Sequence, residues 1–186
     1  AENHTSLSKC YRFGRLDPDT AELFLDKGCF YKACLENGLT APQTFLPHSA
    51  DDARDIASKI GYPCIMKPRY YHKWAVHHGL VKGIVCHNSE ELLIAVQTFC
   101  DGIEAFIIQE IMDGPETDIY VFAAYFDNDS KPHGIFTGQK IRQYPVGFGT
   151  TTMMRTADKP EIVAMSVSFL QKVRYHGLCD VEYKFD

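Results

Sequence analysis

The order of short apolar segments and capped helices is the feature that most constrains how this 186-residue chain can fold. Runs of a few apolar residues bounded by polar turns are typical of strands, and longer periodic segments are typical of helices. The resulting order is strand–helix–strand–strand–helix–strand, followed by a meander of strands, a helix and a last strand. A doubly wound parallel sheet requires a regular alternation of strands and helices, which this order lacks. We therefore predict an α+β fold with two mostly antiparallel sheets.

The helix limits are predicted from residues that can cap helix ends. For example, Ser49 precedes a helical segment whose first turn carries Asp51 and Asp52, and carboxylates are favourable at the positive end of a helix dipole. The predicted N-caps are Thr20, Asp26, Ser49, Ser89 and Asp158, and the predicted stops are Gly38, Gly61, Gly102 and Gly177. The predicted strands cover residues 43–47, 63–67, 80–86, 105–111, 117–126, 133–144 and 178–185.

The composition limits the class of protein. The chain is 45% hydrophobic and 23% charged, which is the balance of a folded soluble protein, and no apolar run approaches the roughly 20 residues of a membrane span. Its seven cysteines include no C-x-x-C pair, which favours reduced thiols in a cytoplasm over a disulfide framework. A net charge of -5 argues against non-specific nucleic-acid binding by the whole surface.

The charges are arranged in blocks. No carboxylate lies between Asp55 and Glu90, whereas no lysine or arginine lies between Gly83 and Ser130. A second basic block without carboxylates runs from Ser130 to Ala157. Chance clustering on solvated faces is one explanation. The other is a ligand with both anionic groups and hydroxyl or amine groups, which is the chemistry of a nucleotide.

Three segments, taken in their order along the chain, indicate a family. They are DKGCFYKACLENGLTAPQTF, IGYPCIMKP and FIIQEIMDGPETDIYVF, and together they resemble the ATP-grasp superfamily of carboxylate–amine ligases. The later segments GIFTGQKIRQYP…GFGT and GLCDVEYKFD are most similar to the carbamoyl-phosphate-synthase-like and D-aspartate-ligase-like types. The resemblance implies two α+β lobes that clasp ATP between them. It divides the chain into an extended lead-in (1–19), a helical connector (20–42), a small lobe (43–109) and a larger lobe (110–186).

The resemblance also implies residues that bind ATP. Lys27 and Lys67 match the two lysines that hold the nucleotide phosphates, and an ammonium group suits mobile phosphate oxygens. At the adenine ring, Glu110 matches a position near the amino group, and Ile111 and Met112 match positions that contribute backbone contacts. The apolar side chains of Ile65, Ile111 and Met112 can pack against the ring. Glu116 matches the acid that accepts hydrogen bonds from the two ribose hydroxyls, with Asp118 as a close competitor that shares its face if the two alternate in a strand.

Catalytic and metal-binding positions follow from the same resemblance. Lys140 and Arg142 alternate in a predicted strand and would face the terminal phosphate together, with Arg155 as a third candidate. Glu182 matches a carboxylate that binds Mg²⁺, and Asp180 and Asp186 are possible helpers. The family's next strand, which ends in Glu-x-Asn, does not follow in this sequence. We therefore expect this chain to be a truncated piece that is inactive by itself.

Residues 69–79, with the sequence RYYHKWAVHHG, take the place of the family's phosphate-covering loop. We expect Arg69, Lys73 and His72 to close this loop over ATP. A metal site made of His72, His77 and His78 is disfavoured because no acidic residue or cysteine lies nearby to complete it.

The resulting hypothesis is an ATP-binding, magnesium-dependent ligase domain. It would activate a substrate carboxylate as an acyl-phosphate for attack by an amine or a similar nucleophile, and homo-oligomers are possible. One alternative is a nucleotide-sensing module without catalysis. A less favoured one is a single-stranded RNA binder that uses the aromatic residues Tyr70, Tyr71 and Trp74 beside Arg69 and Lys73.

Overall fold

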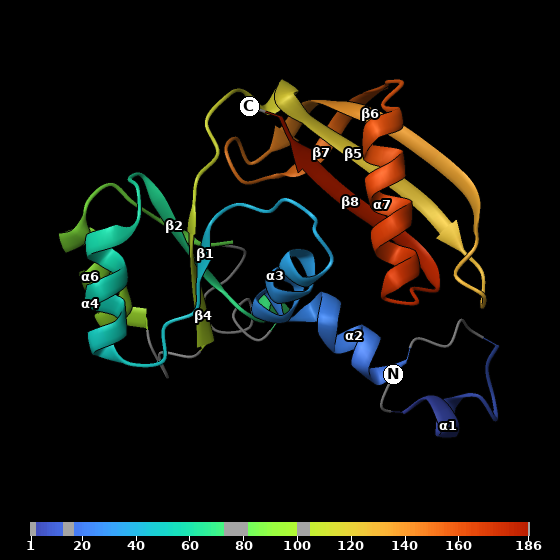
Figure 1. Cartoon of the computed structure of the whole chain (residues 1–186), viewed down its shortest axis with the longest axis horizontal. Coiled ribbons are helices and arrows are strands. Elements are labelled where there is room, and N and C mark those ends of the chain that lie inside the picture. The colour runs from blue at the N-terminus through green and yellow to red at the C-terminus, as the bar shows by residue number, and fades with distance from the viewer. Residues whose placement is uncertain (1–2, 13–16, 73–81, 100–104, 186) are drawn as a thin grey trace. The chain divides into compact units, whose positions relative to one another are not determined.

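The structure is a computed structural model of the chain, and it describes residues 3–12, 17–72, 82–99 and 105–185 (Figure 1). The chain divides into two compact units. One is Glu22–Met112, and the other is Asp113–Asp186 together with Ala1–Ala21. Each unit has its own antiparallel sheet, which confirms the prediction of an α+β fold with two mostly antiparallel sheets.

The N-terminal segment was predicted to be extended up to residue 19, and the structure differs there. Residues His4–Leu7 form the short helix α1, and α2 begins at Pro18 and ends at Leu25. Proline is favourable in the first turn of a helix, and the Asp17 carboxylate accepts hydrogen bonds from the backbone N–H groups of Asp19 and Thr20. The N-cap of α2 is therefore Asp17 rather than the predicted Thr20.

The sheet of the Glu22–Met112 unit has the strand order β1-β4-β2-β3. Its strands are β1 (Thr44–Phe45), β2 (Cys64–Pro68), β3 (Ile84–Cys86) and β4 (Phe106–Glu110). The described helices of this unit include α3 (Lys27–Glu36), α4 (Ala50–Lys59) and α6 (Ser89–Phe99). Strand β3 is shorter than the predicted 80–86, of which residues 80 and 81 lie outside the described residues.

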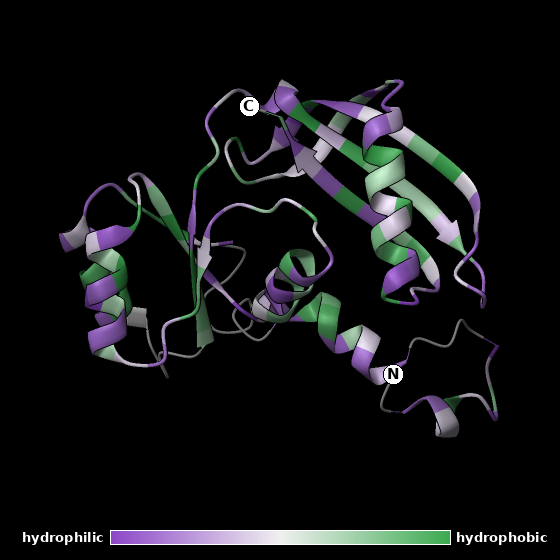
Figure 2. Ribbon diagram, in the orientation of Figure 1, coloured by the Kyte–Doolittle hydropathy of each residue, from purple (hydrophilic) through white to green (hydrophobic). Residues whose placement is uncertain are grey.

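The core of this unit lies between α4, α6 and one face of the sheet. Cys64 and Met66 alternate along β2 and point into it, as do Phe106 and Ile108 from β4, and all four are almost completely buried. The two helices contribute small and branched side chains from one side only, and Figure 2 shows hydrophilic and hydrophobic bands along them. The other face of β2 and β4 is therefore left for different contacts.

Capping residues explain where these helices begin. Asp26 accepts hydrogen bonds from the N–H groups of Gly28 and Cys29, and Ser49 accepts one from Asp52, as predicted. The predicted cap Ser89 lies inside α6, because Asn88 caps that helix by accepting from the N–H of Glu91 at 2.9 Å. The Glu91 carboxylate in turn accepts from the N–H of His87, which completes a reciprocal capping pattern.

The sheet of the second unit has the order β7-β6-β5-β8. It is built from β5 (Ile119–Phe126), β6 (Pro132–Tyr144), β7 (Thr150–Thr156) and β8 (Gly177–Lys184), and the short 3-10 helix η2 (Glu116–Asp118) precedes β5. The sequence reasoning missed β7, whose segment TTTMMRT is almost wholly exposed and lacks the apolar alternation of a half-buried strand.

Helix α7 (Pro160–Lys172) packs on this second sheet, with Ile162, Phe169 and Leu170 buried (Figure 1). The hydroxyls of Ser166 and Tyr183 are 2.8 Å apart and tie the helix to β8. The predicted cap Asp158 is displaced by one residue, because Lys159 occupies the N-cap position and Pro160 starts the helix. Within the described residues, no helix is long and apolar enough to span a bilayer.

Candidate functional site

Lys67 lies on the face of β2 that points away from the α4 and α6 core. Its neighbours Met66 and Pro68 are buried on the core side, so the alternation of the strand places Lys67 and Ile65 on the opposite face. Ile65 is paired with Gln109 of β4, and Gln109 is paired with Thr44 of β1. A lysine, a glutamine and a threonine from three strands therefore share one sheet face.

These polar side chains are connected by hydrogen bonds. Lys67 Nζ donates to Gln109 Oε1 at 2.8 Å, and Gln109 Nε2 donates to Thr44 Oγ1 at 2.8 Å. The hydroxyl of Thr44 donates to the carbonyl of Pro42. The partner of the Lys67 ammonium is thus a neutral amide oxygen, which orients the charge without neutralising it.

The pKa of Lys67 is lowered to about 8, mainly because the side chain is buried and in addition because the positive charges of Lys27 and Lys82 lie nearby. Burial also lowers the pKa of Lys27, against the attraction of the adjacent Asp26 carboxylate. The structure therefore brings the two predicted phosphate lysines into electrostatic contact. An incompletely neutralised pair of this kind is a favourable environment for an anion.

Lys27 is held in place by its neighbour Asp26, which sequence reasoning treated only as a helix cap. The Asp26 side chain is 1% exposed and forms an ion pair with the Arg69 guanidinium, whose Nε donates to Asp26 Oδ1 at 2.9 Å. The backbone N–H of Lys27 also donates to the carbonyl of Arg69 at 3.2 Å. The start of α3 is therefore fastened to the end of β2, which keeps Lys27 beside Lys67.

This ion pair changes the interpretation of Arg69. Against the unfavourable effect of burial, the guanidinium and the N–H of Gly28 bring the pKa of Asp26 to about 2, so the carboxylate is charged at neutral pH. The sequence predicted that Arg69 closes over ATP, but its charge already has a buried carboxylate partner. We therefore assign Arg69 a structural role in positioning α3.

The rest of the predicted phosphate-covering loop is described only up to residue 72. The hydroxyl of Tyr70 donates to the Glu22 carboxylate, and the ring of His72 packs edge-on against the ring of Tyr70. Lys73, Trp74, His77 and His78 lie outside the described residues. The predicted closure of residues 69–79 over ATP thus stays a prediction for that part.

The predicted adenine contacts follow directly on β4. The Glu110 carboxylate accepts from the N–H of Gln43 at 2.6 Å, and the N–H of Glu110 donates to the carbonyl of Gln43. Ile111 and Met112 are half-buried and lie outside regular secondary structure. The predicted adenine contacts of Glu110, Ile111 and Met112 stay a prediction.

Glu116 and Asp118 lie in the 3-10 helix η2, so they do not alternate in a strand as the sequence suggested. Glu116 Oε1 accepts from the N–H of Gly147 at 3.0 Å and from Gln143 Nε2 at 2.9 Å. These two hydrogen bonds, that from Gly147 first, lower the pKa of Glu116. Of the two acids, Glu116 is the one whose carboxylate has defined partners.

Lys140 is 1% exposed, and its Nζ lies 2.8 Å from Glu182 Oε1 and 3.1 Å from Gln143 Oε1. The predicted common face of Lys140 and Arg142 is wrong, because the pairing of β6 with β7 is irregular between these two residues. Lys140 consequently points inward, whereas Arg142 is exposed. The residue that joins Lys140 inside the unit is Gln143.

Arg155, the third predicted cation, lies on β7, where its Nε donates to Gln139 Oε1 at 2.7 Å.

Asp180 and Glu182 form the predicted metal position. They are two residues apart on β8 and therefore share a face. Burial and then the charge of Glu182 raise the pKa of Asp180, and Lys140 opposes this shift. Mg²⁺ needs only one or two carboxylates when phosphate oxygens and water supply the remaining ligands, so this pair fits the ion.

Larger acidic clusters are absent from the part of the chain that the structure describes, where no three His, Cys, Asp or Glu side chains converge on a metal position. The predicted helper Asp186 is not among the described residues.

Sequence reasoning missed two glutamines that organise these sites, Gln109 and Gln143. Gln109 could have been found, because it is the polar exception in the apolar strand FIIQE and pairs in register with the strand of Lys67. Gln143 could not, because its inward direction depends on the irregular pairing of β6 and β7.

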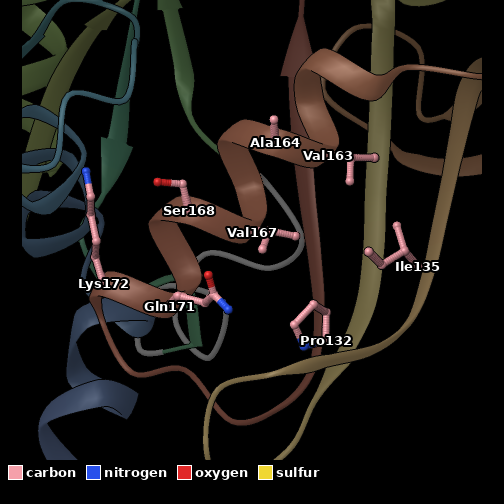
Figure 3. A pocket seen from close by; sticks show the side chains of 8 residues that line it. All are labelled: Pro132, Ile135, Val163, Ala164, Val167, Ser168, Gln171 and Lys172. Atoms are coloured by element: carbon pink, nitrogen blue, oxygen red, sulfur yellow. The ribbon is translucent and has the colours of Figure 1, made fainter.

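A separate groove between α7 and β6 is lined mainly by apolar side chains (Figure 3). Pro132 and Ile135 come from β6, whereas Val163 and Val167 come from α7. Its polar lining residues are Ser168, Gln171 and Lys172, and it contains none of the predicted site residues, so we do not place the functional site there.

No model of a known protein family matches the chain. Among curated proteins, it is 25% identical over 137 residues to the carbamoyl phosphate synthase large chain of Pseudomonas putida, covering 68% of this chain and 12% of that protein. It is 21% identical to the D-aspartate ligase of Enterococcus faecium, over 100% of this chain and 46% of that protein. The chain thus spans less than half the length of these relatives.

Solved structures resemble the chain over most of its length. An L-amino acid ligase from Bacillus licheniformis matches with a TM-score of 0.69 and 18% identity, covering 100% of this chain and 42% of that one. The biotin carboxylase domain of a 2-oxoglutarate carboxylase from Hydrogenobacter thermophilus, solved with MgADP, ADP and bicarbonate, matches with a TM-score of 0.61 and 17% identity, over 88% and 37%. Together with the two antiparallel sheets, these similarities show that the chain has the ATP-grasp fold.

Proposed function

We propose that the chain is part of an ATP-dependent, magnesium-dependent ligase that joins a carboxylate to an amine or a similar nucleophile. Similarity to ligases supports an ATP-dependent ligase function in general. The observation that carries the proposal is the Lys67 site. A half-buried ammonium bonded to a neutral amide, with a second lysine beside it, is costly for a protein to keep unless it binds an anion.

In this proposal the Glu22–Met112 unit binds the phosphates and the base. Lys27 and Lys67 hold the phosphate oxygens, and Ile65, Ile111 and Met112 pack against the adenine. The Asp113–Asp186 unit supplies Glu116 for the ribose hydroxyls and Glu182, with Asp180, for Mg²⁺. When bound, Mg²⁺ would neutralise charge on the phosphates.

The proposed reaction proceeds in two transfers. An oxygen of the substrate carboxylate attacks the terminal phosphorus of ATP and ADP leaves, which gives an acyl-phosphate. The amine then attacks the acyl carbon and inorganic phosphate leaves. Lys140 stabilises negative charge at the phosphoryl group in the first transfer, since positive groups fixed in a buried site act strongly on a transferring phosphoryl.

Calorimetric titration of the chain with ATP and MgCl₂ tests the proposal. Lys67→Met should weaken ATP binding by about tenfold or more, the typical effect of losing one charged hydrogen bond. The matched control is Lys59→Met, which removes an exposed lysine from α4 that pairs only with Asp55 in the same helix. Absence of ATP binding by the wild-type chain, or equal binding by wild type and Lys67→Met, would overturn the proposal.

Turnover distinguishes the ligase from a nucleotide-sensing module. ATP binding with no acyl-phosphate trapped by hydroxylamine from any tested carboxylate, in the full-length protein, would favour the sensor. The RNA-binding alternative is weakened by the contacts of Arg69 with Asp26 and of Tyr70 with Glu22, since both are engaged within the fold.

A further inference from the structure

We propose that Gln143 is a positioning residue that couples the ribose acid Glu116 to the metal acid Glu182 through Lys140. The inference rests on the proposed function, because it assumes that nucleotide and metal use these two acids. It goes beyond that function by predicting that the two binding events are energetically linked through one side-chain amide.

The amide of Gln143 lies between two charged groups of opposite sign. Its Nε2 donates to Glu116 Oε1 at 2.9 Å and to the carbonyl of Gly147 at 2.6 Å. Its Oε1 accepts from Lys140 Nζ at 3.1 Å, and the same Nζ is 2.8 Å from Glu182 Oε1. A continuous chain of hydrogen bonds thus joins the two acids, which are 66 positions apart in the sequence.

The charges at its two ends fix the orientation of this amide. Rotating it by half a turn would place the NH₂ group against the Lys140 ammonium and the oxygen against the Glu116 carboxylate. Gln143 is 6% exposed and Lys140 is 1% exposed, so water cannot easily replace either contact. In such surroundings an amide with one defined orientation transmits the charge at one end to the other.

The backbone around Gly147 supports the same arrangement. Its N–H donates to Glu116 while its carbonyl accepts from Gln143, so the loop after β6 closes on both partners. Gly147 has φ +95°, a conformation that other residues adopt only with strain. A change at Glu116 therefore acts on Gln143 both directly and through this loop.

Lys140 is the point at which the metal enters the coupling. A cation bound at Glu182 competes with the Lys140 ammonium for Oε1 and so leaves Lys140 more dependent on Gln143 Oε1. A stronger Lys140–Gln143 contact polarises the amide N–H groups that hold Glu116. Metal binding at one acid thereby helps to order the other acid for the ribose hydroxyls.

Double-mutant cycles test the coupling directly. ATP affinity in MgCl₂ is measured by calorimetry for wild type, Glu116→Gln, Glu182→Gln and the double variant, and again for the same four proteins carrying Gln143→Met. In the first cycle we expect the two effects to depart from additivity by about threefold or more, as for residues that share one network. In the Gln143→Met cycle they should be additive within about twofold.

A third cycle carries Gln139→Met as the matched control. Gln139 is also a glutamine of β6, but its amide contacts the Thr117 carbonyl and Arg155 instead of the two acids. We expect this background to keep the non-additivity of the first cycle, and thermal unfolding checks that all proteins are folded. Additivity in the first cycle, or non-additivity that survives Gln143→Met, would overturn the inference. Failure of wild type to bind ATP would instead refute the proposed function.

Discussion

Replacing Lys67 by methionine should make the protein more stable while weakening ATP binding. A largely buried, charged lysine on the face of β2 that points away from the core is unfavourable in the absence of an anion, and methionine has similar length without the charge. Lys67 bonds to the neutral amide of Gln109 and has the positive charge of Lys27 nearby, and no carboxylate among the described residues pairs with it. The variant therefore separates the requirements of binding from those of folding.

The size of the gain follows from the pKa. A shift from the ordinary value of 10.5 to about 8 corresponds to about 3 kcal/mol of unfavourable interaction with the charged form at neutral pH. Methionine removes this cost, but it leaves Gln109 Oε1 without its lysine donor, which costs about 1 kcal/mol. The expected net increase in the free energy of unfolding is about 1–2 kcal/mol.

The dependence on pH has a definite sign. Between about pH 8 and 10.5 the unfolded chain binds a proton at Lys67 that the folded chain has lost, so wild-type stability gains from rising pH in this window. Below the window the full cost is present, and above it the cost disappears. The advantage of Lys67→Met should therefore shrink by about 2 kcal/mol between pH 7 and about pH 9.5.

Urea unfolding at both pH values measures this change in the stability difference. The proteins compared are wild type, Lys67→Met and the control Lys59→Met. Titrating groups that do not interact with Lys67, including the cysteines, are common to the three proteins and cancel in the differences, whereas the repulsion between Lys27 and Lys67 is lost in Lys67→Met. Lys59→Met should change stability by less than about 0.5 kcal/mol at either pH, because its ion pair with Asp55 is exposed. A Lys67→Met protein less stable than wild type at pH 7, or a difference independent of pH, would refute the reasoning.

Three further predictions concern other charged or capping groups. The pKa of Asp26 is lowered to about 2, so its ionised carboxylate should contribute about 2 kcal/mol to the free energy of unfolding above about pH 4. This contribution should be lost as the pH falls towards 2, and acid unfolding of the wild type compared with an Arg69→Met variant measures it. Asn88→Ala should lower the stability by about 1 kcal/mol through loss of the α6 cap on Glu91, seen as a lower melting temperature. Glu182→Gln should raise the Kd for ATP about tenfold or more in MgCl₂ and much less in EDTA, and equal effects in both would contradict its role as a metal ligand.

Much of the fold was predictable because it depends on local signals. Asp26 and Ser49 cap their helices as the sequence indicated, since a side-chain oxygen needs only the next few N–H groups. The apolar runs around Lys67 and Gln109 became strands of one sheet. By contrast, Ser89 and Asp158 each lie one residue away from the true cap, because a neighbouring residue occupies the cap position.

The parts that could not be predicted depend on contacts between distant residues. Lys140 and Arg142 alternate in the sequence, but the irregular pairing with β7 turns only Lys140 inward, and β7 itself carries no apolar pattern. Glu116 and Asp118 could not be ranked from the sequence, since the choice rests on Gln143 and Gly147. The sequence therefore predicted the candidate residues, whereas the side chains that each of them contacts decide the role that it can have.

Lys67 and Arg69 illustrate this difference at close range. Lys67 lies in β2 and Arg69 directly follows that strand, and both were expected to contact ATP. Arg69 has the buried Asp26 carboxylate as its partner, whereas the side-chain partner of Lys67 among the described residues is the neutral oxygen of Gln109. At this end of β2, the neutralised cation Arg69 holds the structure, and the ammonium of Lys67 is the one that we propose to bind an anionic ligand. Asp26 thus serves the proposed site indirectly: it neutralises the charge of Arg69 and caps α3, and so leaves Lys27 and Lys67 as the two lysines that we propose to bind phosphate.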